Sequence, residues 1–187
     1  MIQCFIAKCN DIKLQRYYSK ELLRYSIKSV FKVEIEDEAV MRNQYGKPSF
    51  KNNEHIKFNI SHCDGLIACA VGLEEMGVDV ENIRSFDDYV VIRVCNMKEI
   101  NDIYSSHDSK RTFFTYWTMK ESLGKALGVG LHYPLRENEF IKNGDGYLCN
   151  YEGLKIKNYE IDNKFILSIC TDKNEEIILR GVNLDGR

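Results

Sequence analysis

Two short stretches of this chain carry side chains that could hold a metal ion next to a phosphate. The first, Gly77-Val78-Asp79-Val80-Glu81, has two carboxylates separated by one residue within an apolar, β-branched run. On a strand this spacing points both carboxylates to the same face. Two like charges held side by side repel each other unless a cation lies between them, and Mg²⁺ prefers carboxylate oxygens. The alternative is an ordinary acidic pair on a solvated sheet face.

The second stretch has the spacing of one helix ridge, since Trp117, Glu121 and Lys125 lie at successive i, i+4 positions. It adds a third carboxylate and a cation for the remaining charge of a phosphate. An amphipathic helix with a common Glu–Lys pair would have the same spacing. Gly124 argues against that simpler explanation, because a glycine inside a helix costs about 1 kcal/mol relative to alanine. Its presence predicts that another segment packs closely there.

The overall composition is that of a soluble globular protein. The chain has 187 residues, 44% of them hydrophobic and 29% charged, which suits one domain or two tightly packed halves. No apolar run approaches the roughly 20 residues of a membrane span, and the start has no signal-peptide pattern. We therefore expect a cytoplasmic protein. The formal net charge of −2 does not favour nucleic acid, and the seven cysteines contain no C-x-x-C pair, which favours free thiols.

Periodicity predicts an alternation of helices with short strands. Helices are expected at residues 12–31, 86–104 and 111–127, the last ending at Gly128. Strands are expected at 2–7, 55–60, 66–71, 76–80, 147–150, 155–161, 165–170 and 177–182. A loop is expected around Gly46 and Pro48.

The first predicted helix carries a row of basic side chains at i+3 or i+4 spacing: Lys13, Arg16, Lys20, Arg24 and Lys28. A solvated cationic face is the simpler explanation of such a row. The alternative is a patch that attracts a polyanion, either a ligand phosphate or an acidic protein.

Together these motifs resemble the 4'-phosphopantetheinyl transferase superfamily, in its pseudo-duplicated, surfactin-synthetase-activating type. The hallmarks are G-x-D-x-E at 77–81, W-x-x-K-E-x-x-x-K at 117–125, G-K-P at 46–48 and F-N-x-S-H at 58–62. The resemblance implies an α+β fold of two similar halves related by a pseudo-two-fold, each a small antiparallel sheet packed on a helix. We expect the halves to be residues 1–84 and 85–187, the second containing the carrier-docking surface. A short repeat, 57–63 against 164–170, agrees with this division.

The resemblance also implies roles for the acidic residues. Asp79, Glu81 and Glu121 would be ligands of Mg²⁺, and Lys125 would contact a pyrophosphate and help to remove a proton. The expected catalytic residues are therefore Glu81, Glu121 and Lys125, with the role of Glu81 as ligand, base or both left open. Lys120 lies about 100° around the helix from Glu121, so we expect only a supporting role for it.

Coenzyme A would be bound by Lys47, Ser61, His62, Lys125 and, on a looser match, Arg16. The chain departs from the family pattern after the histidine, where Cys63-Asp64-Gly65 replaces the usual Ser-Gly. An upstream pair of lysines is also missing, and we expect the basic row on the first helix to substitute for it.

The expected activity is Mg²⁺-dependent transfer of 4'-phosphopantetheine from coenzyme A to a serine of an apo acyl or peptidyl carrier protein, releasing adenosine 3',5'-bisphosphate. A monomer should suffice, with no nucleic acid or membrane as partner. One alternative is a coenzyme A or nucleotide-binding module that has lost transfer. Another, weaker one is a nucleic-acid-binding protein that uses the basic helix, which predicts steep salt dependence.

Overall fold

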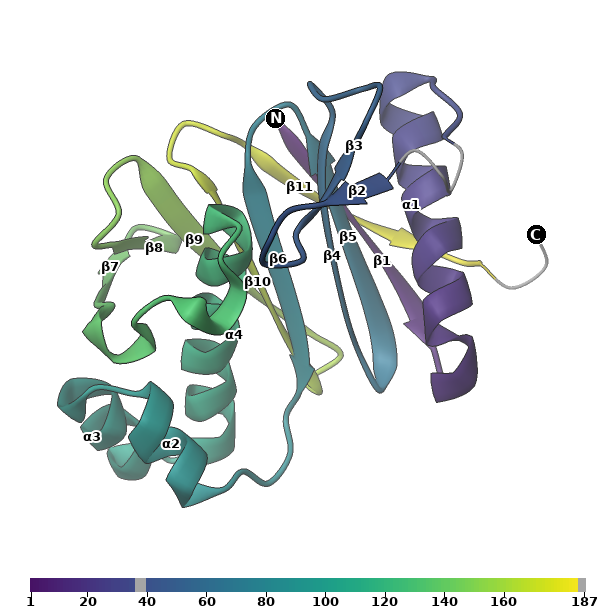
Figure 1. Cartoon of the computed structure of the whole chain (residues 1–187). Helices are drawn as coiled ribbons and strands as arrows, with labels where there is room; N and C mark the ends of the chain where they lie inside the picture. Colours follow the sequence, from purple (N-terminus) through teal and green to yellow (C-terminus); the bar gives the residue numbers. More distant parts are fainter. Residues whose placement is uncertain (36–39, 185–187) are drawn as a thin grey trace.

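The computed structural model describes residues 1–35 and 40–184. Within them the chain forms two large sheets, each with one long helix on a face, and one small two-stranded sheet (Figure 1). The first sheet has the strand order β11-β1-β5-β4 and carries helix α1 (Gln15–Phe31). The second has the order β6-β10-β9-β8-β7 and carries helix α4 (Ser109–Leu127). The expected α+β class with two sheet-and-helix halves is confirmed.

The strands of the first sheet are β1 (Ile2–Cys9), β4 (Lys57–Cys63), β5 (Gly65–Gly72) and β11 (Ile177–Val182). Those of the second are β6 (Met76–Asn82), β7 (Phe140–Asn143), β8 (Gly146–Cys149), β9 (Leu154–Ile161) and β10 (Phe165–Asp172). A short hairpin of β2 (Val40–Arg42) and β3 (Pro48–Phe50) stands apart from both sheets. One pair departs from the expected antiparallel arrangement, since β1 and β11 run parallel.

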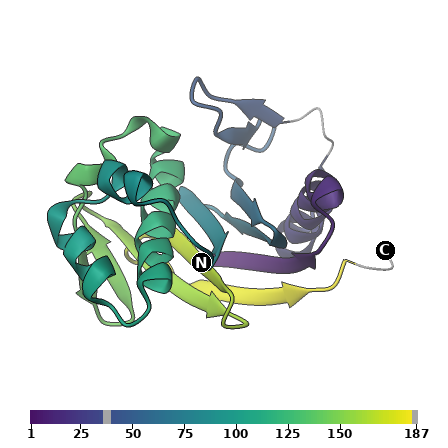
Figure 2. The same ribbon diagram turned by 90° about the horizontal axis from the view of Figure 1, so that it is seen from below.

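Alternating residues explain how the layers pack. On β1, Ile2 and Cys4 join a core that also contains β6 and β10, whereas Phe5 and Ala7 face α1. A strand points successive side chains to opposite faces, so one strand supplies both cores. Figure 2, seen from below, shows α1 and α4 standing on opposite sides with strands between them.

Each sheet also contains a strand from the other side of the expected boundary between the halves. Strand β6, from the first half, pairs with β10 of the second. Strand β11, near the chain end, pairs with β1. The division into residues 1–84 and 85–187 stays a prediction, because the sheets are built from both. The short sequence repeat does not mark equivalent strands, since β4 lies at the edge of its sheet and β10 lies inside the other.

Most predicted elements are found with small shifts at their ends. The expected helix at 86–104 is instead two helices, α2 (Asp88–Val94) and α3 (Met97–Ser105). The break follows from Asn96, whose side chain caps α3 while Glu99 bonds back to the Asn96 backbone. Helix α4 ends as expected at Gly128, which has φ +73°.

Two expectations from composition can be compared with the structure directly. None of the seven cysteines, all of which lie in the described ranges, forms a disulfide. No helix of residues 1–35 and 40–184 is long and apolar enough to cross a membrane.

Candidate active site

Strand β6 lies directly against helix α4, and Gly77 makes this possible. A Cβ on Gly77 would lie 1.9 Å from the backbone oxygen of Ser122 and 2.4 Å from the nitrogen of Ala126. Gly124 has a similar role on the helix, since its Cβ would meet the Gly130 oxygen at 2.3 Å. The close packing predicted at Gly124 is therefore confirmed, and the packing at Gly77 brings the acidic strand and the acidic helix together.

The centre of the site is an ion pair between Lys125 and Asp79. The Lys125 Nζ donates to Asp79 Oδ1 at 2.6 Å, to the Val78 backbone oxygen at 3.1 Å and to Ser61 Oγ at 3.1 Å. The Asp79 side chain is only 6% exposed and that of Lys125 is 25% exposed. Three residues predicted as site residues from separate motifs therefore meet at one point.

The edges of the two sheets meet at this point through side chains. Among residues 1–35 and 40–184, strand β6 has no ladder partner on its β4 side, and two of its N–H groups bond to side chains of β4 instead. The Val78 N–H donates to Asn59 Oδ1 at 2.9 Å, and the Val80 N–H donates to Ser61 Oγ at 3.3 Å. These two backbone N–H groups of β6 are thereby satisfied.

Glu121 lies one turn before Lys125 on α4, in an unfavourable setting for a negative charge. The pKa of Glu121 is raised to about 7, mainly by burial and also by the carboxylates of Asp79 and Glu81, against the lowering effect of Lys125. The three predicted acids are therefore close enough to interact. Such a group of mutually repelling carboxylates is electrostatically suited to a cation.

The carboxylate oxygens of this cluster are suitable ligands for a divalent metal, but they are not yet arranged around one point. Asp79 Oδ2 is buried and has no hydrogen-bond partner among the described residues, as a ligand waiting for a cation would be. In the same part of the chain, however, no three His, Cys, Asp or Glu side chains stand together as a ready metal site. Glu81 instead forms an ion pair with Arg84, whose Nη1 lies 2.6 Å from Glu81 Oε2.

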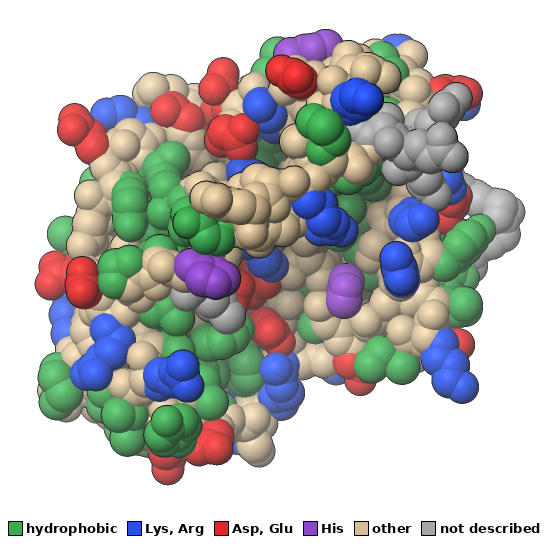
Figure 3. All heavy atoms as spheres, in the orientation of Figure 1, with side chains coloured by type: hydrophobic (Ala, Val, Ile, Leu, Met, Phe, Trp, Pro, Cys, Tyr) green, Lys and Arg blue, Asp and Glu red, His purple; other side chains and the backbone are tan. Residues whose placement is uncertain are grey.

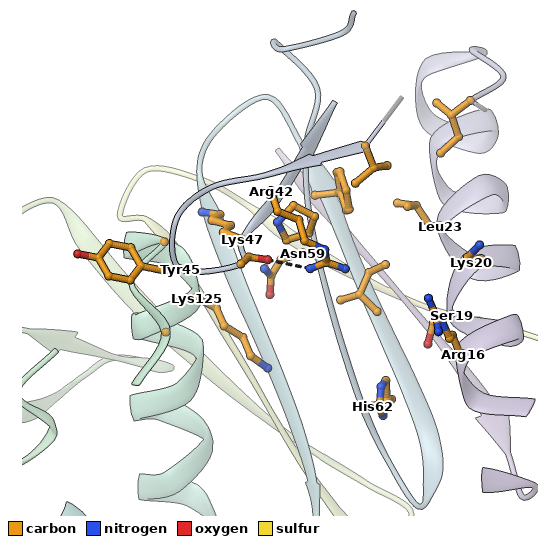
Figure 4. Close-up of a pocket in the computed structure, with 18 of the residues that line it drawn as sticks. Arg16, Ser19, Lys20, Leu23, Arg42, Tyr45, Lys47, Asn59, His62 and Lys125 are labelled. Atoms are coloured by element: carbon orange, nitrogen blue, oxygen red, sulfur yellow. Dashed lines mark hydrogen bonds between the residues drawn. The ribbon is translucent and has the colours of Figure 1, made fainter. Parts of the chain in front are cut away.

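A pocket of about 760 Å³ opens beside this cluster, between α1, β4, the β2–β3 loop and α4. Figure 4 shows side chains from all four segments pointing into it. Its charged lining is almost entirely basic, with Glu121 the single acid among the described lining residues, and Figure 3 shows Lys and Arg side chains around the hollow. The basic and imidazole side chains that line it are Arg16, Lys20, Arg24, Arg42, Lys47, His62 and Lys125.

The predicted coenzyme A residues divide around this pocket. Arg16, Lys47, His62 and Lys125 line it, and Ser61 lies behind it in the Asp79 cluster. The pocket volume lies in the range of small-molecule sites. The basic row on α1 is thus partly a pocket wall.

The loop between β2 and β3 reaches the end of α4 (Figure 4). Lys47 Nζ donates to the Ala126 backbone oxygen at 2.8 Å and also pairs with Glu75. Asn43 accepts from the Lys47 N–H at 2.9 Å and donates to the Gly128 oxygen at 2.8 Å. The loop thereby binds carbonyls that the helix end leaves unpaired.

Lys120 faces away from the pocket, into the second half. Its Nζ pairs with Glu99 and donates to the Leu135 backbone oxygen at 2.7 Å, and both charged side chains are buried. The expected supporting role thus takes the form of contacts with α3 and the segment after α4.

Several pocket residues were not predicted from sequence. Arg42 and Tyr45 were not singled out, because one basic residue at a strand end or one aromatic residue in a loop has no distinctive pattern, and Lys20 was named only as a member of the basic row. Asn59 was part of the F-N-x-S-H motif, which could have marked it, but no role was assigned to it.

Comparison with known proteins gives a consistent result. Residues 75–176 match the family model described as the 4'-phosphopantetheinyl transferase superfamily. The chain is similar to "4'-phosphopantetheinyl transferase Sfp" of Bacillus subtilis, with 27% identity over 89% of this chain and 82% of that one. It is also similar to "4'-phosphopantetheinyl transferase gsp" of Aneurinibacillus migulanus, with 31% identity over 75% and 60%. The matched segment contains both acidic motifs and more than half of the chain, so this protein belongs to the 4'-phosphopantetheinyl transferase superfamily.

Proposed function

We propose that this protein transfers the 4'-phosphopantetheine group of coenzyme A to a serine hydroxyl of an apo acyl or peptidyl carrier protein. Adenosine 3',5'-bisphosphate is the other product. The observation that carries the proposal is the basic pocket that ends at the Lys125–Asp79 pair with Glu121 beside it. A polyanion of three phosphate groups suits the pocket charge, and family membership supplies the reaction class.

We assign the following roles to the residues of the pocket. Arg16, Lys47 and His62 bind the phosphates of the adenosine end and hold the diphosphate near Lys125. Lys125 neutralises charge that develops on the diphosphate as the serine oxygen attacks the β-phosphorus and the P–O–P bond breaks. Positioning and electrostatics then account for most of the rate.

Asp79, Glu81 and Glu121 would hold a divalent cation, which when bound supplies charge neutralisation for the diphosphate. The serine proton needs an acceptor, and a carboxylate of this group is suited to it. Glu81 is our candidate acceptor, in the role of base that the family resemblance leaves open for it. Lys125 already donates three hydrogen bonds and is used as a charge rather than as a base.

The proposal extends to the setting of the reaction. We propose that the protein acts in the cytoplasm and as a monomer. The monomer is supported by the single chain that contributes both walls of the pocket.

The test is to mix the protein with apo carrier proteins, coenzyme A and Mg²⁺ and to measure the mass of each carrier. A gain of one phosphopantetheine group is expected, and it should be abolished by Asp79→Ala and by Glu121→Ala while both variants stay folded. Coenzyme A binding without any mass gain, over several acyl and peptidyl carriers, would identify a binding module instead. Activity retained in either variant would contradict the metal assignment.

A further inference from the structure

We propose that Ser61 is a positioning residue for Asp79 rather than a ligand of coenzyme A. This inference rests on the proposed function, and it reassigns a residue that the family resemblance places on a cofactor phosphate. The hydroxyl of Ser61 donates to Asp79 Oδ1 at 2.8 Å. Both side chains are buried, so this bond is shielded from water.

The hydrogen-bonding capacity of the Ser61 hydroxyl is fully used in this arrangement. A serine hydroxyl has one proton to donate and two lone pairs to accept with. The proton goes to Asp79, and the acceptor positions receive the Val80 N–H at 3.3 Å and the Lys125 Nζ at 3.1 Å. A phosphate oxygen accepts hydrogen bonds and does not donate them. Ser61 could therefore reach a phosphate only by giving up Asp79.

The anchored oxygen of Asp79 determines where the other oxygen lies. Oδ1 is held by Ser61 and Lys125, while Oδ2 is buried and has no hydrogen-bond partner in the described part of the chain. A cation approaching Asp79 would find Oδ2 already oriented. Because Ser61 holds Oδ1 independently, the carboxylate keeps this orientation when Lys125 turns toward a bound diphosphate.

Asn59 contributes to the same arrangement, because it fixes the strand that carries Asp79. Asn59 and Ser61 are two residues apart on β4, and their side chains accept from Val78 and Val80, which are two residues apart on β6. The two bonds thus set how far β6 can slide along β4, where no backbone ladder joins the strands. These two bonds explain why the polar residues of the F-N-x-S motif lie two positions apart on the strand.

The chain offers a matched control at Ser168. This serine is also fully buried, and on β10 it is the direct neighbour of Asp79 in the ladder. Its hydroxyl bonds to Thr118 at 2.6 Å and to Asn158 at 2.7 Å, and no bond from it to Asp79 is formed. Ser168→Ala therefore removes a buried hydroxyl from the same neighbourhood without touching the Asp79 carboxylate.

The experiment measures metal and coenzyme A binding separately in the full-length protein. Mn²⁺ affinity is followed by electron paramagnetic resonance without coenzyme A, and coenzyme A affinity by calorimetry in the presence of chelator. Ser61→Ala should weaken Mn²⁺ binding about 10-fold or more, as loss of an outer-shell partner does. It should change metal-free coenzyme A affinity by less than about 2-fold, well under the effect of losing a phosphate contact. Ser61→Thr keeps the hydroxyl and should restore Mn²⁺ affinity, and Ser168→Ala should leave it near the wild-type value.

Three results would overturn the inference: unchanged Mn²⁺ affinity in Ser61→Ala, an equal loss in Ser168→Ala, or weakened metal-free coenzyme A binding in Ser61→Ala. Denaturant unfolding checks that each variant is folded. If Ser61→Ala does not fold, Ser61→Cys replaces it, because a thiol of similar size is a weaker donor and should give a partial loss of Mn²⁺ affinity. Transfer by the wild-type protein is assayed in parallel. Its absence would count against the proposed function, while the binding results would still decide the role of Ser61.

Discussion

The ammonium group of Lys120 lies 2.9 Å from the carboxylate of Glu99 inside the protein, where both side chains are almost fully buried. The pair joins α4 to α3, and the Lys120 backbone oxygen also accepts from the Tyr133 hydroxyl. Glu121 is the next residue on the same helix and faces the opposite environment, the basic pocket. The buried pair therefore fixes the rotation of the helix that presents the candidate catalytic residues.

Replacing Lys120 with alanine should destabilise the protein by about 3–5 kcal/mol, because the Glu99 carboxylate would be left buried without its partner. Urea denaturation followed by circular dichroism measures this loss. Lys110→Ala, at an exposed position on the first turn of α4, is the control and should change the free energy of unfolding by less than about 0.5 kcal/mol. Equal effects of the two variants would mean that the buried pair does not hold the helix.

The Gly77→Ala variant should separate the acidic strand from α4. The added Cβ would overlap backbone atoms of Ser122 and Ala126, which have no freedom to move as a side chain does. Overpacking of this kind costs about 1–3 kcal/mol or more, and we expect transfer activity to fall with it. Gly181→Ala on β11 is the control, because a Cβ there meets no atom within 4 Å. Unchanged stability in Gly77→Ala would contradict the observed packing.

Glu121→Gln should stabilise the metal-free protein at alkaline pH while abolishing transfer. The pKa of Glu121 is raised from 4.5 to about 7 by burial, so the folded state holds this proton more tightly than the unfolded chain. The wild type therefore loses stability as pH rises from about 4.5 to 7, and the glutamine variant avoids that loss. Above pH 7 the variant should be more stable by about 1–3 kcal/mol.

Urea denaturation with chelator at pH 5 and pH 8 measures the difference, which should be small at pH 5. Added Mg²⁺ should stabilise the wild type more than the variant, because a ligand stabilises the state that binds it. A difference that is the same at both pH values would rule out the raised pKa as its origin.

Arg16→Ala should weaken coenzyme A binding about 3- to 10-fold, the effect of losing one charge-assisted contact at an accessible site. Lys13 belongs to the same basic row but precedes α1 and lies outside the pocket lining, so Lys13→Ala is its control. Calorimetry at two salt concentrations measures both variants. The loss should shrink at high salt, where exposed charges are screened. Equal losses in the two variants would point to a general charge effect rather than to the pocket.

The amino-acid sequence by itself determined the local features of this protein. Strand and helix periodicity, the end of α4 at Gly128 and the placing of Asp79 and Glu81 on one face all follow from rules that act over a few residues. The two packing glycines could also be identified, because Gly77 and Gly124 sit where another residue type would be preferred. The acidic motifs were sufficient to suggest the superfamily.

Tertiary structure alone decided which of these side chains meet. Lys120 contacts Glu99 while Glu121 faces the pocket, and this difference depends on how α4 packs. The residues next to them in the sequence do not indicate it. That Ser61 bonds to Asp79 depends on two sheet edges that come together without a backbone ladder. Contacts between segments 18 to 64 residues apart arise from the packing of whole layers, and short-range patterns contain no information about them.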